Sequence, residues 1–266
     1  MSALRVGRIA ALNMYPVYHG LEEAGAADLE FVDGMPTALN QALLDGDLDV
    51  SAMSSIAYAR NASRLVLVPV ASITAEGAVD SIQLFSRVPF ERVRTVAVTP
   101  HSATSVALLR ILLGPEAAPF ERLDAPAPEA LRRVDGVLLI GDEALEGLRR
   151  PFAPHRTDLG AAWRALTGQP MVFAVWAARA DSARRDPEAL ARLAERLRQA
   201  QSAYRADPER VVAAAAARYP FPADFIRGYF RRLSYGFGEA ERAGLTEFLR
   251  RARLEGLLDA LPRLAA

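Results

Sequence analysis

Two polar sites in the first third of the chain have side chains suited to binding a small polar molecule. Asn13 follows the apolar segment 4–9, and Ser54 and Ser55 follow the apolar segment 48–52. In open α/β sheets, ligands bind beyond the carboxyl ends of the strands, so these three residues are candidates for a site. The alternative is that Asn13 bonds its own loop backbone and that the serines only cap a helix.

A third polar segment, 99–105, carries four hydroxyl side chains within seven positions at another junction between a strand and a helix. Hydroxyl groups and free backbone N–H groups at a helix start favour an anion. Two such junctions that face each other would hold a molecule with two carboxylates from both sides. The candidates from this segment are Ser102, Thr104 and Ser105.

Further candidates lie around residues 76–81 and 158–160. Ser81 begins an apolar segment, and Gly160 would allow a backbone N–H to approach a ligand closely. Asp158 is a candidate cap for the helix that follows it. Glu76 and Asp80 are the nearest carboxylates that could act as bases, although charged side chains in a turn are usually solvated.

Several kinds of chemistry are excluded by composition. The chain has no Cys and no Lys, which excludes disulfides, thiolate metal sites and Schiff bases on Lys. Its three His residues lie far apart, and no nucleotide-binding or metal-binding motif is present. With 32 basic and 32 acidic residues, the chain has no basic field for nucleic acid or an anionic membrane. We therefore expect no cofactor, no metal and a small-molecule partner.

The candidates must be positioned by alternating strands and helices, which predict an α/β fold with parallel strands. The pattern restarts after Pro89, and a strong apolar strand begins at Met171. We therefore expect two lobes with a ligand cleft between them. Lobe one would comprise residues 1–86 and 174–266, and lobe two residues 87–173, with crossings near 86–89 and 170–173.

The N-terminal segment has no apolar stretch of the kind found in a signal peptide. No stretch in the chain approaches the roughly 18 consecutive apolar residues of a membrane span. We expect a soluble, cytoplasmic protein.

Taken in order, these segments resemble the chorismate dehydratases of the futalosine route to menaquinone. Each segment is unspecific alone, but the ordered set covers nearly the whole chain and is weakest between residues 114 and 133. Gln169 departs from the pattern, where an apolar residue is expected. The segments that carry the resemblance are Leu12-Asn13 with Pro16, Ser54-Ser55-Ile56, Ser81 to Ser86, Ser102 with Thr104-Ser105, and Asp158-Leu159-Gly160 with Trp163.

The resemblance implies a fold like type II periplasmic binding proteins, used here for catalysis. Its reaction would be the elimination of water from chorismate to give 3-[(1-carboxyvinyl)oxy]benzoate without a cofactor. The enolpyruvyl carboxylate of the substrate would itself act as the base. Asn13 and Ser81 would be the catalytic side chains, and the substrate would be bound by Ser54, Ser55, Ser102, Thr104, Ser105 and Gly160.

Two alternatives remain open from the sequence. One is a dihydroxynaphthoate synthase, a sister family of the same pathway with the same fold. The other is a binding protein that carries a small carboxylate without transforming it, because the fold alone does not distinguish a carrier from an enzyme.

Overall fold

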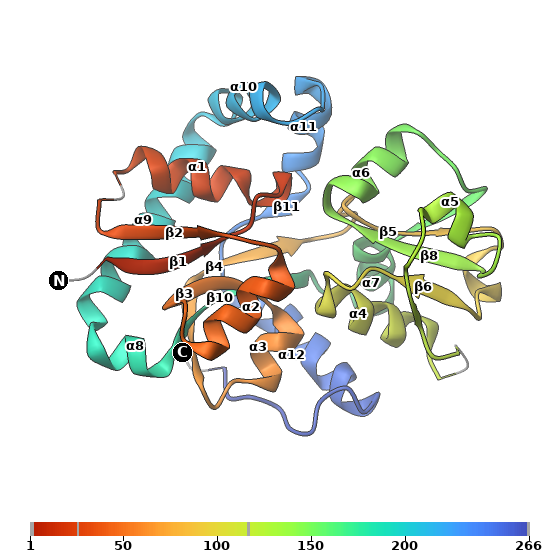
Figure 1. Cartoon of the computed structure of the whole chain (residues 1–266), viewed down its shortest axis with the longest axis horizontal. Coiled ribbons are helices and arrows are strands. Elements are labelled where there is room, and N and C mark those ends of the chain that lie inside the picture. Colours follow the sequence, from red (N-terminus) through yellow and green to blue (C-terminus); the bar gives the residue numbers. More distant parts are fainter. Residues whose placement is uncertain (1–2, 26, 116–117, 265–266) are drawn as a thin grey trace.

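Apolar segments of the chain form two separate sheets, each covered by helices (Figure 1). The computed structural model describes residues 3–25, 27–115 and 118–264. The first sheet has the strand order β11-β4-β10-β3-β1-β2, and the second has the order β7-β6-β8-β5-β9. Because each sheet has its own helices, the protein has the expected two α/β lobes.

Lobe one is formed by both ends of the chain. Its N-terminal elements are β1 (Leu4–Arg8), η1 (Leu12–Met14), α1 (Tyr15–Glu23), β2 (Leu29–Asp33), α2 (Pro36–Asp45), β3 (Val50–Ser54), α3 (Ser55–Arg60) and β4 (Leu65–Ala75). Its C-terminal elements are β10 (Met171–Arg179), α8 (Ala180–Arg185), α9 (Pro187–Ala206), α10 (Pro208–Arg218), α11 (Ala223–Phe230), β11 (Leu233–Ser234) and α12 (Glu239–Leu254).

Lobe two is formed by one continuous segment. Its elements are β5 (Ile82–Ser86), η2 (Phe90–Arg92), β6 (Val96–Val98), α4 (Ala103–Leu113), β7 (Glu121–Arg122), α5 (Ala127–Ala130), β8 (Gly136–Ile140), α6 (Gly141–Arg149), β9 (His155–Asp158) and α7 (Leu159–Thr167).

Both sheets are mixed, which differs from the parallel arrangement expected from the sequence. In the first sheet, β10 lies between β3 and β4 and runs antiparallel to both. In the second sheet, β5 runs antiparallel to both of its neighbours, β8 and β9. The alternation of strands and helices predicts the parallel core of each lobe. It does not predict the direction of a strand that enters or leaves a lobe.

The pairing of strands β5 and β10 indicates where each lobe begins and ends. Strand β5 pairs only within the second sheet, although its residues fall inside the expected limits of lobe one. Strand β10 begins at Met171 and pairs only within the first sheet. We therefore propose that the chain crosses between lobes at residues 76–81 and 168–170, slightly before each expected position.

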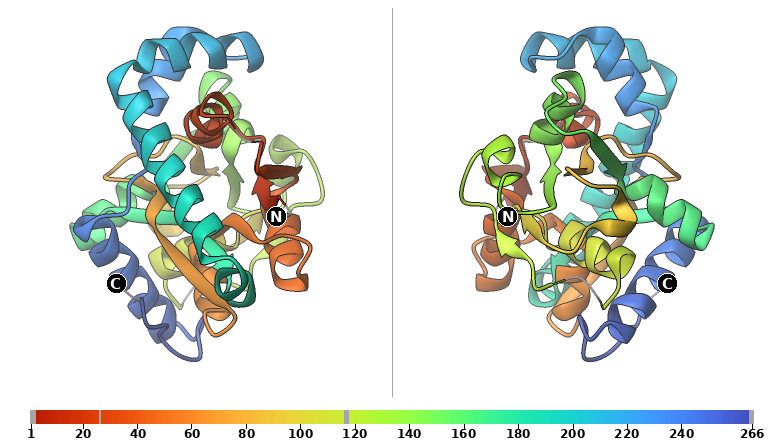
Figure 2. Two further views of the ribbon diagram at one scale, coloured as in Figure 1. Left: turned by 90° about the vertical axis from the view of Figure 1, so that its left-hand side faces the viewer. Right: turned by 90° about the vertical axis from the view of Figure 1, so that its right-hand side faces the viewer.

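The helices that surround lobe one pack closely on it. Figure 2 shows α9 running across the side of lobe one that faces away from lobe two. A Cβ added at Gly20 in α1 would lie 2.6 Å from the Cβ of Ala200 in α9, so only glycine allows this close contact. Among the described residues, no helix is long and apolar enough to span a membrane.

Helix α12 packs against elements of both lobes. Its Phe248 meets the ring of Trp163 in α7 edge-to-face, with centroids 6.1 Å apart. Trp163 donates its indole N–H to the carbonyl oxygen of Pro170 at 3.1 Å. A Cβ at Gly244 of α12 would lie only 2.2 Å from that same carbonyl oxygen. The C-terminal helix thus lies directly against the second crossing between the lobes.

Candidate functional site

A cavity of about 110 Å³ lies between the two lobes, where the candidate residues of the sequence analysis converge. Lobe one contributes Asn13 and Ser54, the first crossing between the lobes contributes Ser81, and lobe two contributes Ser102 and Ser105. Apolar side chains form the rest of the wall, among them Ile9, Met14, Met53, Ile73, Ile82, Ile140 and Phe173. An apolar cavity with a few convergent polar groups is typical of a small-molecule site.

Asn13 reaches the cavity because η1 begins just after β1, at the carboxyl end of that strand. The N–H of Met14 donates to the carbonyl oxygen of Ala11 at 3.0 Å, which holds the turn. The N–H of Leu12 lies 3.4 Å from Oδ1 of Asp142 at the start of α6, so lobe two also contacts this loop. The position of Asn13 therefore depends on both lobes.

The two serines at the start of α3 have different surroundings. Ser54 lines the cavity, and its Oγ is buried without a hydrogen-bond partner among the described residues. Ser55 is fully buried and donates its hydroxyl to the carbonyl oxygen of Val172 at 2.7 Å. Ser55 therefore joins α3 to β10 and does not line the cavity, contrary to its expected binding role.

Thr104 also has a structural contact in place of the expected ligand contact. Its Oγ1 accepts a hydrogen bond at 3.2 Å from the backbone N–H of Ile56, which belongs to the other lobe. This N–H was one of the free donors expected to bind a substrate carboxylate at the start of α3. Thr104 occupies it, and the bond instead ties α4 to α3 across the cleft.

Ser102 and Ser105 present a hydroxyl pair to the cavity at the start of α4. Ser102 is the N-cap of the helix: its Oγ accepts from the N–H of Ser105 at 3.3 Å. The Ser102 hydroxyl donates to Oγ of Ser105 at 2.7 Å, which leaves the Ser105 hydroxyl free to donate. Because α4 spans eleven residues, the positive end of its dipole is directed at this part of the cavity.

Ser81 is positioned by a turn that Asp158 organises. The carboxylate of Asp158 accepts hydrogen bonds from the N–H groups of Val79 and Asp80, from the side chain of Gln83, and from the N–H of Ala161. Asp158 is thus the expected cap of α7, and it also holds the first crossing between the lobes. Ser81 itself is 2% exposed and lines the cavity.

The carboxylates expected as possible bases near this turn do not line the cavity. Glu76 is exposed. Asp80 forms an ion pair with Arg232 and has a φ of +57°, a strained value for a residue other than glycine. Burial raises the pKa of Asp80, and Arg232 opposes this shift.

Gly160 is likewise explained by packing. A Cβ at this position would lie 2.3 Å from the carbonyl oxygen of Gly77 and 3.2 Å from Cβ of Val79. Glycine is needed here so that α7 can approach the crossing segment, and Gly160 is not among the residues that line the cavity. Of the eight candidate residues, five line the cavity and three, Ser55, Thr104 and Gly160, do not.

His101 lines the cavity, although the sequence analysis did not select it. Its Nδ1 is buried without a hydrogen-bond partner among the residues that the structure describes, as are Oδ1 of Asn13 and Oγ of Ser54. Buried polar atoms are usually paired, so three such atoms on one cavity indicate a polar ligand. The sequence feature that could have identified His101 is its position within the hydroxyl-rich segment 99–105.

One carboxylate directly follows a residue that lines the cavity. Asp142 follows Gly141, whose backbone lines the cavity. Burial raises the pKa of Asp142, and the hydrogen bond from the N–H of Leu12 opposes this shift. Among the described residues, no group of three or more His, Cys, Asp or Glu side chains could hold a metal ion.

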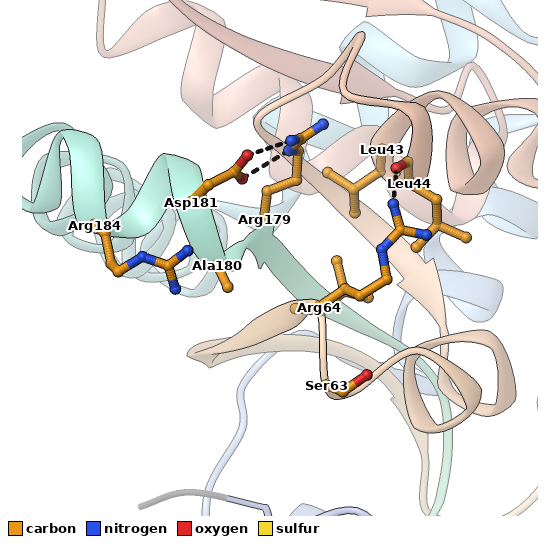
Figure 3. A pocket seen from close by; sticks show the side chains of 9 residues that line it. Leu43, Leu44, Ser63, Arg64, Arg179, Ala180, Asp181 and Arg184 are labelled. Carbon is orange, nitrogen blue, oxygen red and sulfur yellow. Dashed lines mark hydrogen bonds and ion pairs between the residues drawn. The ribbon is translucent and has the colours of Figure 1, made fainter.

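A second hollow, of about 230 Å³, lies on lobe one beside α2 and α8 (Figure 3). Two of its arginines have partners within the protein: Arg179 pairs with Asp181, and Arg64 donates to the carbonyl oxygen of Leu44. None of the candidate residues contributes to this hollow. The cavity between the lobes is therefore the candidate site.

The two lobes define the class of fold, which is that of the periplasmic binding proteins. Two solved structures share this fold. Protein AF1704 from Archaeoglobus fulgidus has a TM-score of 0.76 at 17% identity, covering 96% of this chain and 98% of its own. The periplasmic aliphatic sulphonate binding protein SsuA from Escherichia coli has a TM-score of 0.69 at 17% identity, covering 99% and 96%.

Sequence comparison gives the family. The family model described as Menaquinone biosynthesis matches residues 4–254. Chorismate dehydratase from Thermus thermophilus is 34% identical over 256 residues, covering 89% of this chain and 90% of the relative. The chain therefore belongs to the menaquinone biosynthesis family.

Proposed function

We propose that this chain is a chorismate dehydratase, a hydro-lyase that converts chorismate to 3-[(1-carboxyvinyl)oxy]benzoate. The observation that carries the proposal is the 34% identity to a chorismate dehydratase across 89% of this chain. The family model matches residues 4–254, a range that includes every residue that lines the cavity.

The chemistry of the cavity supports this reaction. Elimination of water from chorismate removes the proton at ring C3 and the hydroxyl group at C4, and the ring becomes aromatic. The enolpyruvyl carboxylate of the substrate can reach the C3 proton, so the protein need not supply a strong base. No redox change occurs, so the proposal requires no cofactor.

In this proposal, Asn13 of lobe one and Ser81 of the first crossing hold the reacting part of the substrate. An amide both donates and accepts hydrogen bonds, which suits the alignment of a carboxylate that must then take up a proton. Ser81 and Ser105 would donate hydroxyl hydrogens to substrate oxygens, because the Ser102 hydroxyl already donates to Ser105. Donors fixed before the substrate arrives stabilise developing charge without reorganisation.

The test is to incubate purified protein with chorismate and analyse the products by liquid chromatography and mass spectrometry. We expect an aromatic product that has lost one water relative to chorismate. Binding of chorismate without conversion would instead indicate a carrier. If chorismate is neither bound nor converted, the proposal is contradicted, and a dihydroxynaphthoate synthase remains as the competing assignment.

A further inference from the structure

His101 has a distinctive place in the cavity between the lobes. Among the described residues that line this cavity, it is the one with an imidazole ring, the side chain most often used for general acid–base catalysis. The other polar lining side chains are an amide and hydroxyls: Asn13, Ser54, Ser81, Ser102 and Ser105. Nδ1 of His101 is buried and has no hydrogen-bond partner among the described residues.

The backbone around His101 is held in place. Its N–H donates to Oγ1 of Thr99 at 3.3 Å, and Thr99 is itself buried. The next residue, Ser102, is the N-cap of α4. The imidazole therefore projects from an ordered turn between β6 and α4, on the lobe opposite Asn13.

The proposed reaction needs a proton donor. Hydroxide is a poor leaving group, and a proton delivered to the departing oxygen lowers the barrier to cleavage of the C4–O bond. Amides and serine hydroxyls donate hydrogen bonds but do not release a proton near neutral pH, whereas imidazolium does. We propose that His101 is the general acid that protonates the departing C4 hydroxyl group, an inference that rests on the proposed function.

The atoms balance without a co-reactant. The C3–H bond breaks, its proton passes to the enolpyruvyl carboxylate, and its electron pair forms the C3–C4 π bond of the aromatic ring. The C4–O bond breaks with its electron pair on oxygen, which takes the proton from His101 and leaves as water. The carboxylate then releases its proton to solvent, and His101 takes up a proton from solvent. The net change is the loss of one water from chorismate.

Two other roles for His101 would give different kinetics. An imidazolium that only binds a substrate carboxylate would raise KM when removed and leave kcat nearly unchanged. A histidine that only shapes the turn would slow every substrate equally. General-acid catalysis instead predicts that removing His101 lowers kcat more for a strongly basic leaving group than for a weakly basic one.

The experiment compares His101→Gln with wild type on two substrates. One is chorismate, and the other is an analogue with fluorine in place of the C4 hydroxyl group, which leaves as a weakly basic anion. We expect kcat for chorismate to fall by at least about a hundredfold, while kcat for the fluoro analogue stays within about threefold of wild type. His155→Gln is the matched control, because His155 is exposed on β9 and outside the cavity.

Each other outcome overturns the proposal. Equal losses on both substrates would indicate a structural role, and a change confined to KM would indicate carboxylate binding. If wild type converts chorismate and His101→Gln does so within about threefold, this inference fails and the proposed function stands. If wild type itself makes no product from chorismate, the proposed function fails, and this inference with it.

Discussion

Asn13 enters the cavity from lobe one and Ser81 enters it from the first crossing, and neither side chain carries a charge. Their neighbours Ser54, Ser102 and Ser105 are also uncharged, so a substrate with two carboxylates would be held by hydrogen bonds and by the positive end of α4. Such a site is sensitive to any added negative charge, because no arginine among the described lining residues compensates for it. Two substitutions test this property.

Asn13→Asp keeps the side-chain shape but replaces an amide donor with a carboxylate. We expect kcat for chorismate to fall by at least about a hundredfold, the usual effect of losing one fixed donor in an active site. The circular dichroism spectrum should be unchanged, since Asn13 is only half-buried. Asn61→Asp, at the end of α3 and outside the cavity, is the control; near-normal turnover by folded Asn13→Asp would contradict the role.

Ser105→Asp places a carboxylate at the start of α4, where the proposal places a substrate carboxylate. We expect KM for chorismate to rise by at least about tenfold, equivalent to roughly 1.4 kcal/mol of repulsion and lost hydrogen bonding. Ser202→Asp introduces the same charge on the exposed surface of α9 and should leave KM unchanged. Equal KM values for the two variants would place the substrate carboxylates elsewhere.

At the scale of residues, the sequence predicted the cavity-lining side chains that lie near the ends of strands. Ser54 ends β3 and Ser81 directly precedes β5, while Asn13, Ser102 and Ser105 lie in the turn or the first helical turn after a strand. The structure brings all five to the cavity. Ser55 and Thr104 were not separable from them by sequence, because a hydroxyl can equally bond a neighbouring element. Those partners, Val172 and Ile56, are set by packing between elements distant in the chain.

At the scale of elements, the cavity is enclosed because helices from different lobes bond to each other. Helices α3 and α4 meet through Thr104 and Ile56, and the η1 loop meets α6 through Leu12 and Asp142. These contacts lie on two sides of the cavity. They hold the two lobes together around it.

Thr104→Val tests the contact between α3 and α4. Valine has nearly the same shape but cannot accept a hydrogen bond, so the buried N–H of Ile56 would lose its partner. We expect the free energy of unfolding to fall by about 1–3 kcal/mol, measured by denaturant titration. Thr246→Val, on the exposed face of α12, should change it by less than about 0.5 kcal/mol. Equal stability of the two variants would mean that the contact contributes little.

The element order was largely predictable, but strand direction was not. The spacing of apolar residues, together with Pro and Gly at helix ends, located the helices of lobe one. Met171 was correctly identified as the start of a strand. The position of β10 between β3 and β4 depends on contacts between residues about a hundred positions apart. Local patterns contain no information about such pairings, and the same holds for β5, whose partners lie far along the chain.

At the scale of the whole molecule, α12 braces the second crossing between the lobes. Gly244→Ala would place a Cβ 2.2 Å from the carbonyl oxygen of Pro170, which also accepts from Trp163. We expect the free energy of unfolding to fall by about 1–3 kcal/mol, because the backbone must shift to relieve the contact. Gly228→Ala in α11 is the matched control: nothing lies within 4 Å of its added Cβ, so stability should stay equal or rise.

Acid sensitivity is expected from a buried carboxylate in lobe one. Burial alone would raise the pKa of Asp49, but hydrogen bonds from Arg5, Ser182 and Arg185 hold it well below its usual range. Because the folded-state pKa is depressed, this stabilisation is present above the unfolded-state pKa of about 4 and is lost as pH falls through the folded-state value.

We therefore expect Asp49→Asn to be less stable than wild type at pH 7, since two guanidinium groups lose their partner. Its free energy of unfolding should fall less steeply between about pH 5 and pH 2. Urea titrations at several pH values measure both effects. Asp259→Asn, at an exposed position near the C-terminus, should keep the wild-type dependence of the unfolding free energy on pH. If Asp49→Asn also keeps that dependence, Asp49 is not the source of the acid sensitivity.

The central place of β10 in the first sheet has a consequence for biosynthesis. Without β10, the remaining strands of that sheet form two unconnected sets, β11-β4 and β3-β1-β2. During translation the strands β1 to β4 are made first, yet they cannot be joined until residue 179 has been made. Lobe two is a continuous segment and can complete its sheet earlier, so the lobe begun first is completed last. The nascent chain must therefore keep the apolar faces of β3 and β4 from other partners while lobe two is synthesised.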